Sequence, residues 1–339
     1  MATRRGDTLI FQTPPVIAAH AAVGGKKEGE GPLAAGFDAL SADNRFGQSS
    51  WEAAETQLQL RAARLCLKKA QTTEKEVSLA LAGDLQAQCT ASNYTMRTLG
   101  IPYAGLFGAC STMAEALGLG AALCSAGLAD GLLAMASSHF CTAERQFRTP
   151  LSYGAVRTPT AQWTATAAGC CVVGAQSEGP YITHTVRGRI VDLGVTDVAN
   201  MGAAMAPAAY DTLTALFRDT GTAPSDYDLV VTGDLGYLGH ALLVELFRRD
   251  GVVLGDNCTD CGILLYDRVK QDMHAGGSGC GCSAAVLNGY LLQGLRMGKW
   301  QRLVFAPTGA LLSPTSSFQG ESVPGICHAV VLSHTKEAQ

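Results

Sequence analysis

Apolar positions along the first half of this chain recur either at helical spacing or in short continuous runs, and the two patterns alternate. They predict helices over 50–70, 90–98 and 111–126, and strands over 77–82, 103–107, 131–137 and 167–174. Short apolar runs between helical stretches are typical of a mainly parallel sheet covered by helices. The first half is therefore predicted to have an α/β fold.

The second half repeats this plan. Its pattern predicts strands over 180–190, 228–232, 302–307 and 327–333, helices over 206–219, 238–250 and 283–297, and a short apolar segment over 262–266. The same alternation of elements in both halves raises the question of whether the chain is duplicated.

Two short sequences recur in the same order and context. LAGDL at 81–85 resembles VTGDL at 231–235, and GACS at 108–111 resembles GCGCS at 279–283 before a helix rich in glycine and alanine. Chance matching of small residues is the alternative explanation. We predict a five-layered α/β/α/β/α body built from two duplicated halves, 1–178 and 179–339.

The predicted helix over 111–126 is apolar on nearly all sides, unlike the amphipathic helices of a protein surface. Gly118 and Gly120 would let neighbouring elements approach it closely. We therefore expect this helix to be central and buried.

The composition is that of a compact globular protein: 339 residues, of which 47% are hydrophobic and 16% charged. The net charge of −4, without a basic cluster beyond two Lys-Lys pairs, argues against nucleic-acid binding. The N-terminus lacks the apolar core of a signal peptide, and the longest apolar run, 116–129, is too short to span a bilayer. We expect a cytosolic chain whose twelve cysteines are reduced.

Cys110 is the leading candidate for a functional residue, because it lies between the strand predicted to end at Phe107 and the helix predicted to begin at Ser111 or Thr112. In that position the amide N–H groups and the dipole of the helix favour the thiolate, which acts as a nucleophile or contacts an anion. The alternative is a buried core cysteine, since free cysteines are among the most buried residues. The pattern alone leaves both open.

A second group of candidates follows the strand predicted over 131–137, at the same sheet edge as Cys110. His139 comes first, and Arg145 and Arg148 follow it. An arginine can hold a carboxylate with two hydrogen bonds. The alternatives are a structural histidine and exposed ion pairs with neighbouring acids.

Asp84 and Asp234 end equivalent strands of the two halves. They would supply paired acids, although aspartate in such a position more often caps the following turn or helix. Asn93 would reach the Cys110 pocket from the preceding helix, and it too has capping as its alternative.

Cys258, Cys261, Cys280 and Cys282 have a spacing that four thiolates around zinc would need. However, Cys280 and Cys282 are predicted to begin a buried helix, in the position that Cys110 has in the first half. A zinc knuckle needs two tight turns that face each other. We therefore predict no metal site, and no sequence feature indicates a cofactor.

A duplicated α/β chain with a cysteine at the start of a buried helix resembles the thiolase and ketoacyl-synthase superfamily. More narrowly, the chain resembles the stage V sporulation protein AD family of spore-forming bacteria, in the motifs GPL at 31–33, LAGDL at 81–85, LFGACST at 106–112, AERQFR at 143–148, MGAAMAPAA at 201–209, DCG at 260–262, AGGSGC at 275–280 and GALLSP at 309–314. The resemblance implies a thiolase-like fold, a homodimer, and binding of dipicolinic acid (pyridine-2,6-dicarboxylate) for its accumulation in the spore core.

The resemblance also implies a test of catalysis. Enzymes of the superfamily hold an acyl group on the helix-start cysteine and use bases from the second half of the chain. Here Thr232-Gly233-Asp234 stands where condensing enzymes of the initiating type have a histidine, and Gly277-Ser278-Gly279 stands where others have histidine or asparagine. Serine with an ordinary pKa is a poor general base. His274 lies three or four residues from the position of a catalytic base in those enzymes, and whether His328 corresponds to such a position stays open.

Three functions therefore stay open. The one we favour is binding of dipicolinic acid in a pocket at Cys110, supporting its uptake into the developing spore. The second is a thiolase-like acyltransferase or condensing enzyme that uses Cys110 as its acyl-carrying nucleophile with His274 or His328. The third is a scaffold subunit of a membrane transport complex, with a vestigial pocket.

For the favoured function we predict a pocket with Phe140 or Tyr153 as an aromatic wall. The residues predicted to bind the ligand are Cys110, His139, Arg145, Ser278, Asp84 and Asn93. The implied partners are other sporulation membrane proteins of the same transport system. The implied location is the cytoplasmic face of the forespore or spore inner membrane, reached through those partners.

Overall fold

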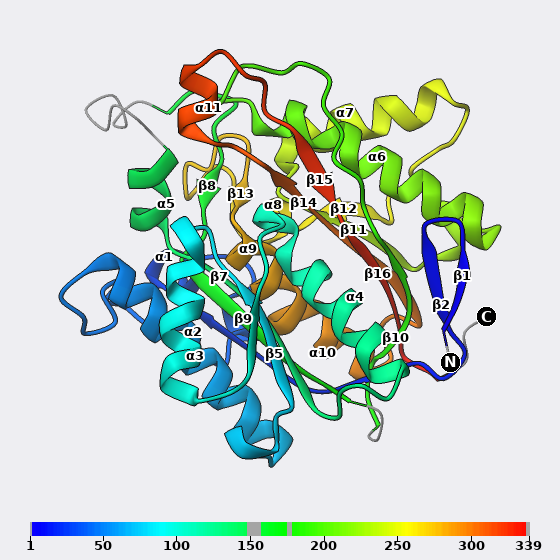
Figure 1. Ribbon diagram of the computed structural model, residues 1–339. Helices are drawn as coiled ribbons and strands as arrows, with labels where there is room; N and C mark the ends of the chain where they lie inside the picture. The colour runs from blue at the N-terminus through cyan, green and yellow to red at the C-terminus, as the bar shows by residue number, and fades with distance from the viewer. Residues whose placement is uncertain (1, 148–156, 175–177, 337–339) are drawn as a thin grey trace.

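The computed structural model of the chain describes residues 2–147, 157–174 and 178–336. Ten strands follow one another through hydrogen-bonded neighbours, and the order of those strands reveals the plan of the fold (Figure 1). That order is β12 (Cys258–Asp260), β11 (Leu229–Gly233), β14 (Arg302–Ala310), β16 (Ala329–Ser333), β10 (Tyr181–Val186), β3 (Val16–Gly24), β9 (Ala167–Gly174), β7 (Leu132–Ser138), β5 (Leu79–Gly83) and β6 (Tyr103–Gly105).

The strand order is the same in the two halves of this path. The five strands of each set are numbered here in chain order. Read from the outer edge of the path to its centre, each set runs third, second, fourth, fifth, first. In each set the fifth strand is antiparallel to both of its neighbours. The two sets meet where β3 and β10 pair at Val16 and Tyr181. The duplication predicted from the sequence is therefore present in the fold.

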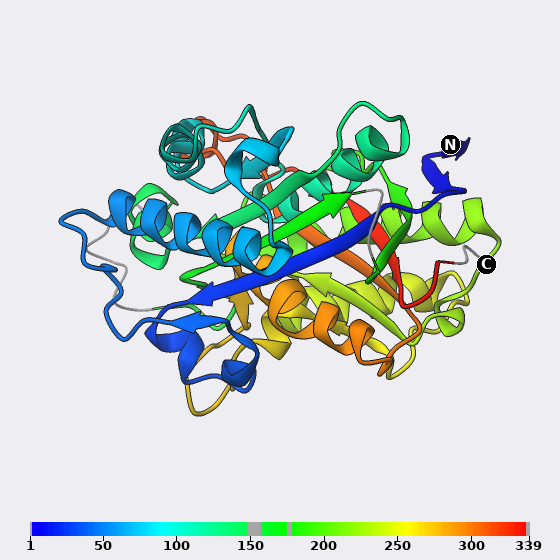
Figure 2. The same cartoon turned by 90° about the horizontal axis from the view of Figure 1, so that it is seen from below.

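Helices form the other layers. The outer helices are α2 (Trp51–Ala70) and α3 (Thr90–Leu99) on the first set of strands, and α6 (Met201–Thr220) and α7 (Gly236–Arg249) on the second; α4 (Thr112–Ser125) and α9 (Cys280–Val286) lie between the sets. Helix α4 contacts β5 and β7 on one side and β14 and β16 on the other. Figure 2 shows α2 along one side of the long strand β3, with the helices that follow Cys280 along the other.

The central helix confirms the expectation from its apolar sequence. Gly118 of α4 lies so close to β10 that an added Cβ atom would overlap the hydroxyl of Thr185. A Cβ on Gly120 would lie 2.8 Å from the side chain of Leu132 in β7. Both glycines are therefore needed for α4 to fit between the two sets of strands.

The expectation of a mainly parallel sheet is wrong. Along the ten-strand path, β5 pairs in parallel with β6 and β7, and β11 with β12 and β14, whereas the central strands pair antiparallel. Every residue of β7 and β9 is buried. These strands therefore have the continuous apolar sequence that is typical of parallel strands, and their direction cannot be read from it.

Several elements are missing from the sequence-based prediction, and β3 is the most important of them. Its sequence is rich in alanine and carries His20, so its β propensity is low. The tertiary structure compensates, because the buried His20 bonds through Nδ1 to the carbonyl oxygen of Asn288 at 2.6 Å. Other unpredicted elements include β1 (Ala2–Arg5), β2 (Thr8–Phe11), α5 (Phe140–Phe147) and β12.

Most boundaries differ from the prediction by a few residues. Helix α6 begins at Met201 rather than 206, because the side chain of Asn200 caps it by accepting a hydrogen bond from the amide of Ala203. The remaining elements are α1 (Lys26–Gly29), β4 (Ala39–Leu40), β8 (Trp163–Thr164), α8 (Cys261–Leu264), β13 (Gly277–Ser278), a π-helical turn (Leu287–Leu291), α10 (Leu292–Arg296), α11 (Pro314–Phe318) and β15 (Gly325–Cys327).

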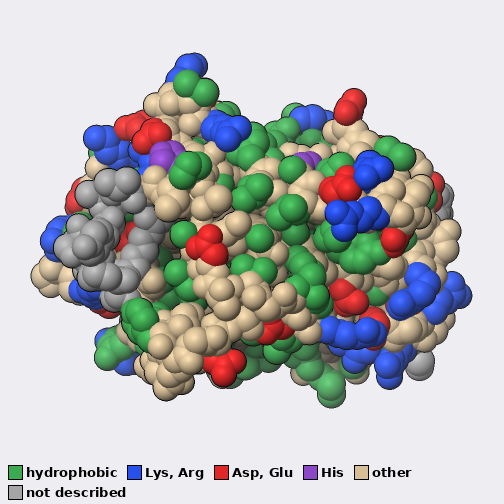
Figure 3. Space-filling view, turned by 90° about the horizontal axis from the view of Figure 1, so that it is seen from above, with side chains coloured by type: hydrophobic (Ala, Val, Ile, Leu, Met, Phe, Trp, Pro, Cys, Tyr) green, Lys and Arg blue, Asp and Glu red, His purple; other side chains and the backbone are tan. Residues whose placement is uncertain are grey.

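Across the described ranges, every helix is too short or too polar to cross a membrane. On the face shown in Figure 3, Lys and Arg side chains are interspersed with Asp and Glu side chains.

Candidate ligand-binding site

Cys110 lies in a single 3-10 turn, Ala109–Ser111, immediately before α4. The turn is tightly held. Ala109 has a φ of 46°, in the left-handed region, and the hydroxyl of Thr112 accepts from the amide of Gly108 and donates to the carbonyl of Ala109. The hydroxyl of Ser283, in the first turn of α9, donates to the carbonyl oxygen of Cys110 at 3.2 Å. The starts of both central helices therefore meet at this cysteine.

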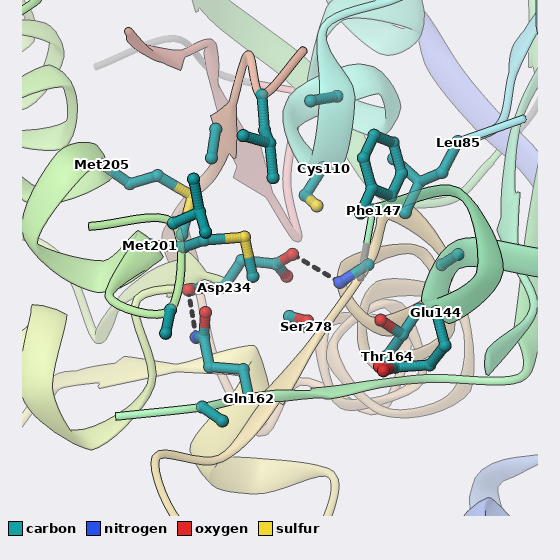
Figure 4. A pocket seen from close by; sticks show the side chains of 18 of the residues that line it. Leu85, Cys110, Glu144, Phe147, Gln162, Thr164, Met201, Met205, Asp234 and Ser278 are labelled. Carbon is teal, nitrogen blue, oxygen red and sulfur yellow. Dashed lines mark hydrogen bonds between the residues drawn. The ribbon is translucent and has the colours of Figure 1, made fainter. Parts of the chain in front are cut away.

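A cavity of about 260 Å³ opens beside the Cys110 side chain (Figure 4). Much of its wall is apolar, formed by Leu85, Phe107, Phe147, Met201, Met205 and Leu312. Its polar side chains are Glu144, Thr158, Gln162, Thr164, Asp234 and Ser278. Strands β8 and β13 pair in parallel with Thr164 beside Ser278, which brings these two hydroxyl groups into the same wall. The cavity thus combines an apolar slot with a polar edge.

Asp234 is the central polar residue of the cavity. It follows β11 with a φ of 68°, and its Oδ2 accepts a hydrogen bond of 2.6 Å from the amide of Gly279. Its carbonyl oxygen accepts from Nε2 of Gln162, and its carboxyl group lies beside the thiol of Cys110. Its Oδ1 is buried and has no hydrogen-bond partner. Figure 4 shows the Asp234 carboxyl group near Cys110, with a dashed line for its hydrogen bond to the amide of Gly279.

Electrostatics keep the Cys110 sulfur protonated. Burial raises the pKa of the thiol well above its usual value, and a charge on the neighbouring Asp234 carboxyl would raise it further, while the amide of Gly279 acts in the opposite direction. The expectation that the helix start favours the thiolate is wrong at this site. The favourable helix terminus is outweighed because removing a charged sulfur from water beside a carboxyl group costs more.

This protonation state predicts slow alkylation. Cys110 and Cys141 are the partly exposed cysteines among those described, and the others are buried. At about pH 7 we expect iodoacetamide to modify Cys110 at least about tenfold more slowly than it modifies free cysteine, because the thiolate fraction falls tenfold per unit of raised pKa. Peptide mass spectrometry over time measures the rate. A fast alkylation of Cys110 whose rate no longer rises with pH above neutral would contradict a protonated Cys110 thiol.

Of the residues predicted to bind ligand, Cys110 and Ser278 line this cavity and four others lie elsewhere. Asp84 caps α3: its Oδ2 accepts from the amide of Ser92 at 2.8 Å. The side-chain Nδ2 of Asn93 donates to the carbonyl oxygen of Gln88 at 2.7 Å, on the protein surface. The capping explanation is the right one for Asp84, and Asn93 does not reach Cys110.

His139 and Arg145 also point away from Cys110. Nε2 of His139 bonds to the carbonyl oxygen of Asn44 at 2.8 Å, and the ring lines a different cavity. Helix α5 turns its residues 143, 144 and 147 toward the Cys110 cavity, so Arg145 faces the other way and pairs with Glu52. Phe140, predicted as an aromatic wall, stacks on Trp163 beside the other cavity. Arg148 and Tyr153 lie outside the described residues.

Neither candidate histidine base lines the cavity. Nδ1 of His274 bonds to the carbonyl oxygen of Thr158 at 2.7 Å, and its Nε2 lies 3.1 Å from Asp272. Nδ1 of His328 accepts from the amide of Gly188, and burial lowers the pKa of His328 to about 4. Within the ranges that the structure covers, the cavity has no histidine in its lining.

Asp234 was weighed from the sequence but not assigned to the site, and Glu144 and Gln162 were missed. The signal for Asp234 was the match of VTGDL to LAGDL, which places both acids where a strand of each half ends. Gln162 and Thr164 flank Trp163 in or beside β8, and side chains two residues apart along a strand face the same side. That signal required knowing that this short segment is a strand.

The fold and this site define a protein of the thiolase and ketoacyl-synthase fold class. Xanthomonas campestris OleA with bound cerulenin is 15% identical with a TM-score of 0.61, covering 98% of this chain and 99% of that one. The 3-oxoacyl-[acyl-carrier-protein] synthase III of Aquifex aeolicus is 12% identical with a TM-score of 0.56, covering 94% and 99%. Likeness at these identities shows the fold alone.

Sequence comparison is more specific. The family model for stage V sporulation protein AD matches residues 5–333, and the stage V sporulation protein AD of Bacillus subtilis (strain 168) is 42% identical over 325 residues, 96% of both chains. The chain therefore belongs to the stage V sporulation protein AD family.

Proposed function

We propose that this protein binds pyridine-2,6-dicarboxylate, or a similar small aromatic dicarboxylate, in the Cys110 cavity without catalysing acyl transfer. One observation carries the proposal: the cysteine at the helix start faces a formed cavity, but its polar neighbours are a buried carboxyl group and a serine instead of imidazole bases. A base typically contributes about 100- to 10,000-fold to such a reaction. The arrangement supports binding better than catalysis.

The chemistry of the cavity supports an aromatic ligand with polar edges. The side chains of Phe107, Phe147 and Met205 offer flat or adaptable apolar surface to a ring. Thr164 and Ser278, which lie side by side in the lining, supply hydroxyl donors for carboxylate oxygens. A planar molecule with two carboxylates flanking a ring nitrogen matches this division between an apolar slot and a polar edge.

Membership of the family supports a proposal for the role in the cell. We propose that ligand binding serves uptake into the developing spore, at the cytoplasmic face of the forespore inner membrane, and that the protein acts as a homodimer with membrane proteins of the same transport system. Membership of a sporulation family supports this role. A scaffold with an unused cavity is the outcome that ligand titration would reveal.

The test fills the mouth of the cavity. Val198 lines the cavity and is 42% exposed, whereas Val253 is 78% exposed and lies outside the lining. In calorimetric titrations with dipicolinate, we expect Val198→Trp to weaken binding by about 10- to 100-fold, the equivalent of the 1–3 kcal/mol that overpacking typically costs. Val253→Trp, the matched control, should bind like the wild type. Equal affinities of both variants, or no binding by the wild type, would refute the proposal.

Acyl transfer has its own readout. Intact-mass measurement after incubation with acyl-CoA should show no adduct on the wild-type chain, because the Cys110 thiol is protonated and lacks a histidine base among the described residues. A stoichiometric acyl adduct that disappears in Cys110→Ala would instead establish the condensing-enzyme alternative.

A further inference from the structure

The Cys110 cavity contains a buried carboxyl group with an unused oxygen, at Asp234. The side chain is fully buried, Oδ2 accepts from the amide of Gly279, and Oδ1 has no partner. A buried polar atom without a partner costs free energy unless a ligand or water satisfies it. Since Asp234 lines the cavity, a bound ligand is in a position to do so.

A second buried acid nearby, Asp260, is surrounded by more hydrogen-bond donors than Asp234. Asp260, in β12, accepts four hydrogen bonds: from the amides of Leu235, Gly236 and Gly262 and from the hydroxyl of Thr232. The carboxyl group of Asp234 accepts one hydrogen bond, from the amide of Gly279. Several amide donors stabilise a buried negative charge, and one does not suffice. Of these two acids, Asp260 is therefore the one equipped to carry the charge.

The other groups around Asp234 do not compensate a charge either. The titratable groups near Asp234, or near its neighbour Asp260, are Asp260, Glu144, Tyr266 and His240 and the thiols of Cys110, Cys261, Cys280 and Cys282. Burial lowers the pKa of His240 and raises the pKa of Tyr266, so both are neutral near pH 7. Among the described residues, the cavity lining has no lysine or arginine. Burial and Asp260 together raise the pKa of Asp234.

We propose that Asp234 recognises the ligand in its protonated form, donating a hydrogen bond from Oδ1 to a ligand carboxylate. The inference rests on the proposed function and names the group that selects the ligand. A protonated Asp234 would use its otherwise unpaired Oδ1 as a hydrogen-bond donor, and the ligand carboxylate oxygen would accept that bond. An ionised Asp234 would instead repel a dianion. Where the free protein has lost this proton, binding takes one up from solution.

The test compares Asp234→Asn with Asp234→Ala by calorimetry with dipicolinate, from about pH 6 to about pH 9. Asparagine keeps the shape and a donor without a titrating proton. We expect Asp234→Ala to lose about 10- to 100-fold in affinity, as the loss of a hydrogen bond to a charged group does, and Asp234→Asn to restore most of that loss. Above the pKa of Asp234, wild-type affinity should fall tenfold per pH unit, while Asp234→Asn stays constant.

Two results would overturn the inference. Equal loss of affinity in both variants, with binding by the wild type intact, would show that a hydrogen-bond donor at this position does not hold the ligand, and would leave the proposed function standing. No binding by any of the three proteins would overturn the proposed function and this inference with it. Unfolding transitions of the variants show whether each one folds.

A second readout needs no ligand. If Asp234 were ionised, removing its charge would lower the pKa of the Cys110 thiol and speed alkylation by tenfold or more. For a protonated Asp234 we expect the alkylation rate of Cys110 in Asp234→Asn to stay within about threefold of the wild type near pH 7. A tenfold acceleration would contradict the inference.

Discussion

Glu55→Gln should stabilise the protein at alkaline pH by several kcal/mol. Glu55, in α2, is completely buried and accepts hydrogen bonds from Ser137, Gln86 and Thr142. Burial, reinforced by the nearby Asp84 carboxyl, raises the pKa of Glu55 to about 8. The glutamate therefore stays protonated in the folded state at neutral pH, although in the unfolded chain it is ionised.

The direction of the pH effect follows from this difference. Because the pKa of Glu55 is higher in the folded state, its contribution to stability is complete below the unfolded pKa of about 4.5 and is lost as pH rises to about 8. Above about pH 8 the folded state is therefore less stable than it is below the unfolded pKa, by roughly 3 to 5 kcal/mol, because the buried glutamate has to ionise. Glutamine keeps the shape and does not titrate, so the advantage of Glu55→Gln should grow with pH.

Urea unfolding at about pH 6 and about pH 9 measures this effect. Glu52→Gln is the matched control, because Glu52 lies one turn earlier in the same helix and forms a surface ion pair with Arg145. An exposed pair contributes at most about 1 kcal/mol. A wild-type free energy of unfolding that does not change between these two pH values would show that Glu55 is not protonated in the folded state.

Gly309→Ala should destabilise the protein by acting on the Cys110 turn. Gly309, in β14, packs so closely on that turn that an added Cβ would overlap the carbonyl oxygen of Gly108 and lie 3.1 Å from the amide nitrogen of Cys110. The overlapping atom belongs to the backbone, so the turn itself has to move. We expect the free energy of unfolding to fall by about 1 to 3 kcal/mol.

Gly174→Ala is the matched control for that substitution. Gly174 also lies in a strand, β9, and no described atom is within 4 Å of its added Cβ. For Gly174→Ala the free energy of unfolding should stay within about 0.5 kcal/mol of the wild type, or rise slightly because the unfolded chain loses conformational freedom. Urea unfolding of both variants measures the difference, and equal stabilities would contradict the close approach of β14 to the Cys110 turn.

The longer helices and the duplicated plan could be predicted from sequence because their signals are local. The apolar surface of α4 and the recurrence of LAGDL and GACS are properties of short segments. The central antiparallel strands could not be predicted, because a strand buried on both faces looks the same in either direction. Strand β3 was missed because tertiary contacts, such as that of His20 with Asn288, stabilise a segment of low β propensity.

The site was predicted in part for the same reason. Cys110 and Ser278 follow from their places in motifs at element ends, and both line the cavity. Arg145 was assigned wrongly because α5 was not predicted, so the side of a helix on which it lies was unknown. The state of the Cys110 thiol depends first on its burial in the fold, and its neighbour in the cavity, Asp234, is 124 residues away in sequence.

The most direct test of the central claim is protection of Cys110 from alkylation by dipicolinate at about pH 7, with Cys141 as the internal reference in the same sample. Cys141 is partly exposed and lines the other cavity. The account predicts that saturating dipicolinate slows modification of Cys110 by at least about tenfold and leaves Cys141 unchanged. Equal rates for Cys110 with and without dipicolinate would contradict it.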